Sequence, residues 1–446
     1  MVLRKIQLEQ SGKEIFTSHG GLALLGQSIA LARLQERLEP LGRYRGMSHL
    51  DMLKTYLGLL CVGKSDYEAA EGVRNDAFFQ AALGIERVPS ASRLRQRMDE
   101  LALEYARAID GANFELLERL EVPVSPVWTG HVPLDLDLFP QDNSGTAKEG
   151  VSYTYKGHDG YGVMAAYLGS EGWCLTADLK PGSENGQLGF GFILDRILGP
   201  AKRLAGRIPL LLRVDSGHDA LENRVRAGHE EIEFLIKWNP RKQCAADWLA
   251  HAESLGHWAD WSQPRPGKRV VTFSVYETQS WQGQETTHRR VIRVIERSID
   301  KAGQHLLVPE LQLDGWWTSL DQPDQEIIAL YQDHATSEQF HSEFKTDLDL
   351  ERLPSGKFDT NTLVMALGAF IYNLLRWIGL AGLIGEQSPV RHKAKRRRLR
   401  TVMQELIYLA AKFSERSRQL RLRFSAHCPA FDAFKRVHAR LTAVLA

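Results

Sequence analysis

Apolar residues recur every three or four positions through the first quarter of the chain. The clearest runs are residues 21–38, 48–63 and 88–101. A helix with 3.6 residues per turn brings positions with this spacing to one face. We therefore predict that residues 1–127 form a helical N-terminal region.

From about residue 128 the pattern changes to short apolar runs that are partly β-branched and bounded by turn residues. These runs cover residues 131–139, 161–169, 172–179, 208–215 and 233–239. A helical pattern at 187–205 lies between the third and the fourth. Strands alternating with a helix predict a mixed α/β fold. A tryptophan-rich, strand-like stretch follows at about 245–325, and helical patterns then continue to the end of the chain.

One apolar run, LVMALGAFIYNLLRWIGLAGLIG at 363–385, is long enough to be tested as a membrane span. Asn373 and Arg376 stand in its middle, and each would be costly in lipid. We predict a pair of buried core helices here and no membrane partner.

Charge is unevenly distributed along the 446 residues. The formal net charge is +1, but residues 391–446 contain fifteen Lys or Arg and three Asp or Glu. This segment therefore carries +12 and the remainder −11. A basic segment on an acidic body indicates a polyanionic partner. The overall content of 43% apolar and 25% charged residues is ordinary for a well-cored globular protein of two or three domains.

The cysteines and the N-terminus bear on the compartment. Cys61, Cys174, Cys244 and Cys428 lie far apart, and no CxxC pair exists. The first residues, MVLRKIQLEQSGKE, contain no apolar core of a secretion signal. We expect no zinc site and a reducing, cytoplasmic location.

Acidic residues end two of the predicted strands, and a further one lies on a later helix. Asp135 and Asp137 stand two apart in LDLDLF, on one face of a strand. Asp215 follows the apolar run LLLRV, where open α/β sheets bind their ligands. In YQDHATSEQFHSEFK, at 331–345, a single helix would carry four polar residues on one stripe. They are Tyr331, His334, Glu338 and Lys345.

Three carboxylates from separate elements, Asp137, Asp215 and Glu338, are suited to binding divalent metal. Packed together without a counterion they would repel one another and raise each other's pKa. Mg²⁺ or Mn²⁺ removes this penalty, and two ions can hold both the attacking and the leaving oxygen at phosphorus. Lys345 and Tyr331 would then contact phosphate oxygens.

Each of these features also has a structural interpretation. Two aspartates on a strand are more often a solvated face, and Asp-Ser-Gly after a strand is more often a turn or helix cap. Glu343 lies close enough to Glu338 to be confused with it.

A short helix at 88–101 is a second candidate for DNA contact. It begins after Pro-Ser and carries an apolar stripe, with Arg93 and Arg97 off that stripe. It could read DNA sequence, or it could be an amphipathic helix with solvated arginines.

In combination, these motifs resemble a known family. Asp137, Asp215 and Glu338 resemble the DDE triad of insertion-sequence transposases with an RNase H-like core. The late helix resembles their Y-x2-R-x3-E-x6-K signature, with His334 at the arginine position. Three longer segments resemble one branch in particular, insertion-sequence family thirteen-eighty. They are LDLDLFPQDNSGTAKEGVSYTYKGHDGYG, RVDSGHD and LPSGKFDTNTLVMALGAFIYNLLR.

The resemblance implies an α/β RNase H-like catalytic core with a β-rich insertion domain, flanked by helical N- and C-terminal regions. The expected domains are a DNA-binding region at 1–127, the core in two parts, the insertion, and a basic helical C-terminal region. The core parts cover 128–244 and 326–385, the insertion 245–325 and the basic region 386–446.

Asp137 takes the first catalytic position by this resemblance, and Asp135 remains its rival. Many relatives have threonine two residues after the catalytic aspartate, whereas this chain has Phe139 at that position. Histidine at position 334 is only partly charged near neutral pH, so its phosphate contact would be weaker than that of arginine.

The family implies a transposase that uses two Mg²⁺ (or Mn²⁺) ions per active site and binds terminal inverted repeats and target DNA as a homodimer. We expect it in the bacterial cytoplasm, on the nucleoid when bound to DNA. Some relatives form a hairpin with a base flipped onto a tryptophan, for which Trp281, Trp316 and Trp317 are candidates, although all three could instead be core. The alternatives are an RNase H-like nuclease without strand transfer and a domesticated DNA-binding protein.

The basic segment would neutralise DNA phosphates and give binding a steep salt dependence. Six of its residues are predicted contacts: Lys393, Lys395, Arg396, Arg397, Arg398 and Arg400.

Overall fold

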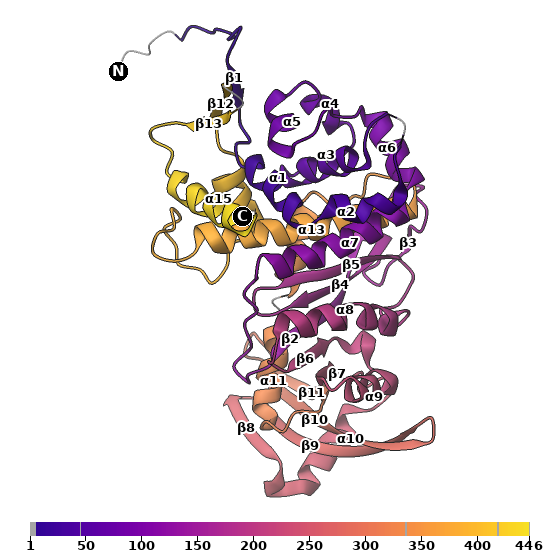
Figure 1. Cartoon of the computed structure of the whole chain (residues 1–446). Coiled ribbons are helices and arrows are strands. Elements are labelled where there is room, and N and C mark those ends of the chain that lie inside the picture. The colour runs from indigo at the N-terminus through magenta and orange to yellow at the C-terminus, as the bar shows by residue number, and fades with distance from the viewer. Residues whose placement is uncertain (1–5, 45, 335–336, 417–418, 446) are drawn as a thin grey trace, which may run out of the picture.

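The computed structural model describes residues 6–44, 46–334, 337–416 and 419–445. In Figure 1 the N-terminal helices lie at one end of the molecule, and a large sheet extends from there to strands β8 to β10 at the other end. The structure is thus a mixed α/β fold, as predicted.

Short helices occupy most of the N-terminal region. They are α1 (Leu22–Leu31), α2 (Leu34–Leu38), η1 (Glu39–Leu41), α3 (His49–Cys61), α4 (Ala69–Val73), α5 (Ala77–Leu83), α6 (Ala91–Glu100) and α7 (Ala102–Arg119). The Ser48 side chain accepts a hydrogen bond from the Asp51 backbone N–H and so caps α3. Ser90 does the same for Arg93 N–H and begins α6, which confirms the predicted Pro-Ser start of this helix.

Ten strands of the described residues form one sheet. In spatial order it runs β3-β4-β2-β6-β7-β11-β10-β9-β8, and β5 also pairs with β4, on the side opposite β2. The first strands are β2 (Val132–Asp142), β3 (Ser152–Tyr153), β4 (Asp159–Leu168), β5 (Trp173–Pro181), β6 (Leu210–Val214) and β7 (Glu233–Lys237). Strands β2, β6 and β7 are parallel, whereas β4 and β5 are antiparallel to their neighbours. The carboxyl ends of β2, β6 and β7 therefore meet at one edge.

The tryptophan-rich stretch continues this sheet. After α10 (Ala245–Leu255) and η3 (Gly256–Trp258) come β8 (Asp260–Arg265), β9 (Lys268–Trp281), β10 (Gln284–Ile299) and β11 (His305–Thr318). Strand β11 pairs with β7 through Trp316↔Lys237, Trp317↔Ile236 and Thr318↔Leu235. The strands expected between 245 and 325 are therefore present, and they join the central sheet through β11.

The helices between and after the strands are α8 (Phe190–Ala205), η2 (Ser216–His218), α9 (Leu221–His229), α11 (Asp324–Asp333), α12 (Ser337–Ser342) and η5 (Glu343–Asp347). The last of these is a π-helical turn. Of the helix predicted for 331–345, Tyr331 lies on α11, Glu338 on α12 and Lys345 on the π-helical turn, and positions 335 and 336 lie outside the described residues. Since Lys345 lies on this π-helical turn, which has more residues per turn than an α-helix, the predicted α-helical spacing is wrong at Lys345.

The apolar run at 363–385 forms one helix, α13 (Phe358–Leu383), and not the predicted pair. By length and composition α13 could cross a membrane, but 94% of its apolar window is buried inside the protein. Since α13 packs against α7, β5 and α3, it is a core helix.

The C-terminal region contains α14 (Leu399–Val402), η6 (Met403–Ile407), β12 (Ala411–Arg416), β13 (Gln419–Phe424) and α15 (Phe431–Leu445). The prediction of a purely helical region was therefore wrong here, and also near the N-terminus, because β12 pairs with β1 (Ile15–Thr17) and with β13. Phe413, on β12, has a ring centroid 5.5 Å from that of Phe78 on α5 and so joins the two ends of the chain.

Asn373 satisfies buried polar groups between α13, β5 and α7. Its Oδ1 accepts from Cys174 N–H at 2.8 Å, and its Nδ2 donates to the Cys174 carbonyl at 2.7 Å and to Asn113 Oδ1 at 2.8 Å. Because no water reaches this side chain, removing it would leave a buried donor and a buried acceptor without partners.

We predict that Asn373→Leu lowers the free energy of unfolding by roughly 3 kcal/mol, measured as a lower urea midpoint. Thr362→Val is the matched control, because the Thr362 hydroxyl only donates to the Phe358 carbonyl of its own helix. It should change stability by less than about 0.5 kcal/mol. Equal effects of the two substitutions would contradict the role given to Asn373.

Candidate active site

The parallel register of β2 and β6 determines the surroundings of the acidic residues. It pairs Asp135 with Arg213 and Leu136 with Val214, so Asp137 and Asp215 come to the next position. Asp137 is near the carboxyl end of the buried part of β2, and Asp215 directly follows β6. The structure therefore brings these two predicted aspartates together at the sheet edge.

Asp135 is part of a buried ion-pair network. Arg213 Nε and Nη2 donate to its two carboxylate oxygens at 2.7 and 2.8 Å, and His334 Nδ1 lies 3.2 Å from Oδ1. Burial alone would raise the pKa of Asp135, but Arg213 and His334 together lower it to about 2. A carboxylate with two cationic partners has little capacity left for a metal, so Asp135 is a structural residue and the weaker choice for the first catalytic position.

The same network holds the C-terminus of α11 to the sheet. Arg213 Nη1 donates to the Leu330 carbonyl at 2.9 Å and lies 3.6 Å from Asp333. Burial opposes charge on His334, but Asp135 raises its pKa. With 6% of its surface exposed, His334 faces Asp135 and offers no surface to a phosphate in this structure.

Asp137 has the opposite environment. Burial, and to a lesser degree the charge of Asp215, raise the pKa of Asp137 to about 6, against the effect of His334 and His218. Its nearest basic group is His341 Nδ1 at 3.8 Å. Burial lowers the pKa of His341 to about 3, so this imidazole is neutral at physiological pH. Asp137 therefore carries a charge without a permanent cationic partner.

Asp215 is held in place by its own turn. Its Oδ1 accepts from Gly217 N–H at 3.1 Å and from His218 Nδ1 at 2.7 Å. Burial would raise the pKa of Asp215, but the hydrogen bond and charge of His218 lower it. With 45% of its side chain exposed, Asp215 remains accessible to a ligand.

Glu338 is exposed on α12 and lines a surface pocket of about 470 Å³ with Arg396 and Arg398. Among the described residues, no group of three His, Cys, Asp or Glu side chains is arranged to hold a metal ion. Glu338 therefore does not complete the predicted three-carboxylate site in this structure. Burial, and after it the charges of Asp137, Asp215 and Glu338, raise the pKa of Tyr155 to about 12.

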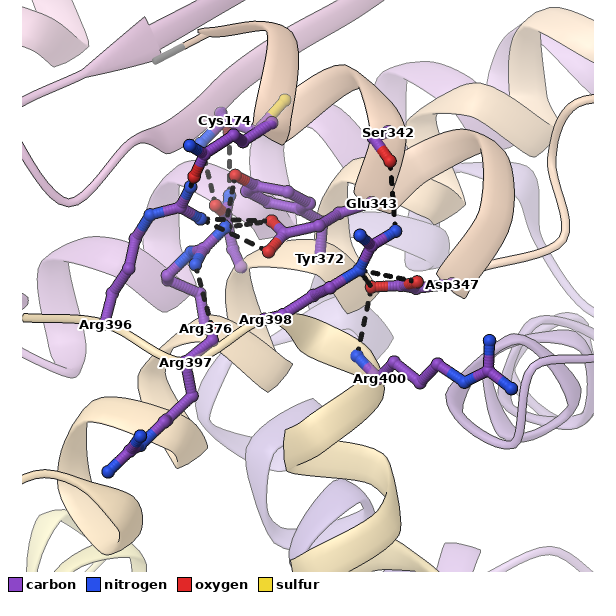
Figure 2. A network of polar contacts seen from close by, with 12 residues as sticks. Cys174, Ser342, Glu343, Asp347, Tyr372, Arg376, Arg396, Arg397, Arg398 and Arg400 are labelled. Carbon is purple, nitrogen blue, oxygen red and sulfur yellow. Dashed lines mark hydrogen bonds and ion pairs between the residues drawn. The ribbon is translucent and has the colours of Figure 1, made fainter. Parts of the chain in front are cut away.

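Glu343, the rival of Glu338, is neutralised by arginines. It is 2% exposed, forms an ion pair with Arg376, and lies 3.2 Å from Arg396 Nη1. Figure 2 shows the two guanidinium groups converging on this carboxylate. Glu343 is therefore a structural residue that attaches the π-helical turn to α13.

The other residues of the late signature also have partners within the chain. Lys345 Nζ lies 3.4 Å from Glu351 and 5.8 Å from the centroid of the Phe139 ring. Tyr331 is half-buried, and its ring centroid lies 6.1 Å from that of Trp316. Burial and then the nearby aspartates raise the pKa of Tyr331.

Half of the predicted basic contacts pack back onto the protein. Arg398 Nε donates to Asp347 at 2.9 Å, Arg397 Nε donates to the Leu383 carbonyl at 3.0 Å, and Arg396 binds Glu343 (Figure 2). Arg398 is nevertheless exposed, as are Lys393, Lys395 and Arg400, and the Arg400 backbone N–H also donates to Asp347. Glu343 and Asp347 thereby anchor the basic segment beside α12.

Of the predicted N-terminal arginines and tryptophans, some are buried and others are at least partly exposed. Arg97 is 1% exposed, with its guanidinium carbon 3.0 Å from the centroid of the Tyr44 ring. It therefore has almost no surface for the predicted DNA contact and is not a solvated arginine either, whereas Arg93 is exposed. Trp316 and Trp317 are buried, whereas Trp281 is half-buried at the end of β9. Of the three tryptophans, Trp281 has the most surface for a base.

Sequence reasoning did not find Arg213, His218 or His341. The first two lie two residues before and three residues after Asp215, inside the motif RVDSGHD, and a charged residue in the buried strand LLLRV required a partner. His341 has no comparable pattern, because only the fold of α12 brings it to Asp137.

Comparison with known proteins identifies the family of this chain. The family model described as Transposase DDE domain group 1 matches residues 2–445, and the chain belongs to this family. It is therefore a DDE transposase, of a family that typically uses divalent metal and acts on DNA. A search of curated proteins found no match. A cryo-EM structure of the piggyBac transposase synaptic complex with hairpin DNA is 10% identical, with a TM-score of 0.41 over 89% of this chain and 82% of that one.

The two neighbouring aspartates should respond oppositely to substitution. Asp137→Asn should stabilise the metal-free protein at pH 7.5 by about 2 to 3 kcal/mol. The pKa of Asp137 is about 6 in the folded protein and about 4 in the unfolded chain, so ionisation of this carboxyl destabilises the fold progressively as pH rises between these values. The gain should shrink at pH 5, where Asp137 is mostly protonated. The measurement is urea unfolding in EDTA at both pH values.

Asp135→Asn should destabilise the protein by about 3 to 5 kcal/mol at pH 7.5, because Arg213 would remain buried without its counterion. The stabilisation from Asp135, whose pKa is lowered, is present above about pH 4 and is lost as pH falls toward 2. Shifts of the same sign for both substitutions would show that the two environments are assigned wrongly.

Proposed function

We propose that this DDE transposase cuts DNA at the terminal inverted repeats of an insertion sequence and joins the freed ends to target DNA. The observation that carries the proposal is the position of Asp137 beside Asp215 at one sheet edge. The Y-R-E-K signature group and its thirteen-eighty branch remain the best description of the chain.

The strand order supports an RNase H-like core. Around the first strand, β2, the antiparallel strands β4 and β5 lie on one side and the parallel strands β6 and β7 on the other. We propose the domain division given above, with the insertion domain built on β8 to β11 and attached through β7.

The donor set suits Mg²⁺ or Mn²⁺, two ions per site. Asp137 is a partly buried carboxylate whose pKa is raised chiefly by burial and then by Asp215, and the Asp215 carboxylate beside it is accessible. When bound, the metal would activate a water or a DNA 3′-hydroxyl and stabilise charge at phosphorus. We propose that Glu338 joins the aspartates only when this positive charge is present, since three unneutralised carboxylates repel one another.

The chain's own residues orient this site. Gly217 and His218 hold the Asp215 carboxylate, and the network of Asp135, Arg213 and His334 fixes β2, β6 and α11 relative to one another. His341 is a neutral imidazole near Asp137 and does not compete with a metal as a cation would. Tyr331 and Lys345 remain predicted phosphate contacts, and reaching phosphate requires Lys345 to leave Glu351.

We further propose that the enzyme acts as a homodimer on double-stranded DNA, in the bacterial cytoplasm and on the nucleoid. The exposed residues Arg93, Lys393, Lys395 and Arg400 are the proposed contacts to DNA phosphates. Trp281 is the proposed acceptor of a flipped base if a hairpin forms.

We predict that Asp137→Asn, Asp215→Asn and Glu338→Gln each abolish Mg²⁺-dependent cleavage of a duplex carrying the inverted repeat, with binding nearly unchanged. Glu326→Gln is the control, because Glu326 is an exposed carboxylate on α11, and it should cleave normally. Normal cleavage by the Glu338 variant would remove it from the triad. Transfer of pre-cut ends into plasmid DNA distinguishes a transposase from a nuclease that only hydrolyses.

We predict that Lys393→Ala with Lys395→Ala weakens DNA binding equally at all sequences and reduces the salt slope of log K by roughly 1.8. Lys202→Ala, an exposed lysine on α8 paired with Glu230, is the control and should leave the slope unchanged. The measurement is fluorescence anisotropy at several salt concentrations. An unchanged slope in the double variant would place the DNA elsewhere.

A further inference from the structure

An exposed tyrosine lies at the rim of the carboxylate site. Strands β3 and β4 form a hairpin whose tip is closed by Thr154 N–H donating to the His158 carbonyl and Gly157 N–H donating to the Thr154 carbonyl. Gly157 adopts φ +86°, which permits this tight turn. Tyr155 stands at the tip, with 63% of its surface exposed.

The Tyr155 ring is held in place although it is exposed. Its hydroxyl donates to the Leu138 carbonyl at 3.0 Å, and Leu138 directly follows Asp137 on β2. An exposed side chain normally keeps its rotamer freedom and loses it on binding. Tyr155 has lost part of that freedom beforehand, and its open ring faces are fixed beside the carboxylate site.

The charge around this ring favours an uncharged contact with DNA. The Tyr155 hydroxyl bonds to the residue that follows Asp137, so a phosphate at this ring would lie near the Asp137 and Asp215 carboxylates and be repelled by them before metal binds. Stacking of a base on an aromatic ring needs no net charge and tolerates any base. Lys156 adds a cation, with Nζ 5.4 Å from the centroid of the Tyr155 ring.

We propose that Tyr155 is a stacking platform for the DNA base next to the phosphodiester that is cut. The inference rests on the proposed function and deepens it, because it names the side chain that places a nucleotide beside Asp137 and Asp215. Stacking there would hold the scissile phosphate beside the carboxylates although they repel it, until bound metal neutralises their charge. Tyr155 is in this sense a substrate-positioning residue.

The experiment is single-turnover cleavage of a repeat-end duplex in Mg²⁺ by the full chain. Tyr155→Ala should lower the rate by about tenfold or more, since stacking contributes roughly 5- to 150-fold per base. Tyr155→Phe keeps the ring and should remain within about threefold of the wild type. Tyr153→Ala is the matched control, because Tyr153 is 67% exposed on the same hairpin and should cleave normally.

An abasic site in the DNA separates stacking from a structural role. With the stacked base removed, wild type should cleave as slowly as Tyr155→Ala, and the variant should lose nothing further. Tyr155→Leu, which keeps the side-chain volume without an aromatic face, replaces the alanine variant if the latter fails to melt cooperatively.

Wild-type rates in a folded Tyr155→Ala or Tyr155→Leu protein would overturn the proposal. The proposal would also be overturned if the rate loss caused by Tyr155→Ala and the rate loss caused by an abasic site multiplied when combined, for an abasic site at every position near the cut. Failure of the wild-type protein to cleave at all would instead refute the proposed function, so the two failures are distinguishable.

Discussion

The pairing of β2 with β6 is the constraint on which the rest of the site depends. By placing Asp135 opposite Arg213, it satisfies one carboxylate of LDLDLF completely and leaves the other, two residues later, without a counterion. The same pairing places Asp215 beside the unsatisfied one. The carboxylates of Asp137 and Asp215, which lack a permanent cationic partner, therefore lie next to the neutralised pair of Asp135 and Arg213. This buried pair keeps β2 and β6 in register.

A second group of ion pairs connects this site to the C-terminal region. Glu343 and Asp347 on the π-helical turn bind Arg376, Arg396 and Arg398, so the turn that follows α12 is attached both to the core helix α13 and to the basic segment. A phosphate backbone that attracted Arg396 or Arg398 would compete with these carboxylates. The position of α12, and with it Glu338, is physically coupled to that segment.

Several acidic and basic residues that the sequence suggested as ligand contacts thus form ion pairs inside the fold. His334 shows this most directly. It occupies the arginine position of the family signature, and its ring is buried against Asp135, while Arg213 on a neighbouring strand supplies the permanent charge. The departure from the signature is accommodated because the buried carboxylate has a second, always charged partner.

The sequence alone determined the mixed α/β class, the strands that carry Asp137 and Asp215, and the burial of α13, because these follow from local periodicity and from the cost of Asn373 and Arg376 in lipid. Only the tertiary structure decided which aspartate is neutralised, that Glu343 is buried, and that a π-helical turn follows α12. These outcomes depend on partners such as Arg213 and Arg376, tens of residues away, whose proximity no local pattern encodes. Electrostatic roles are set by such neighbours, whereas secondary structure is largely set by the residues within a few turns.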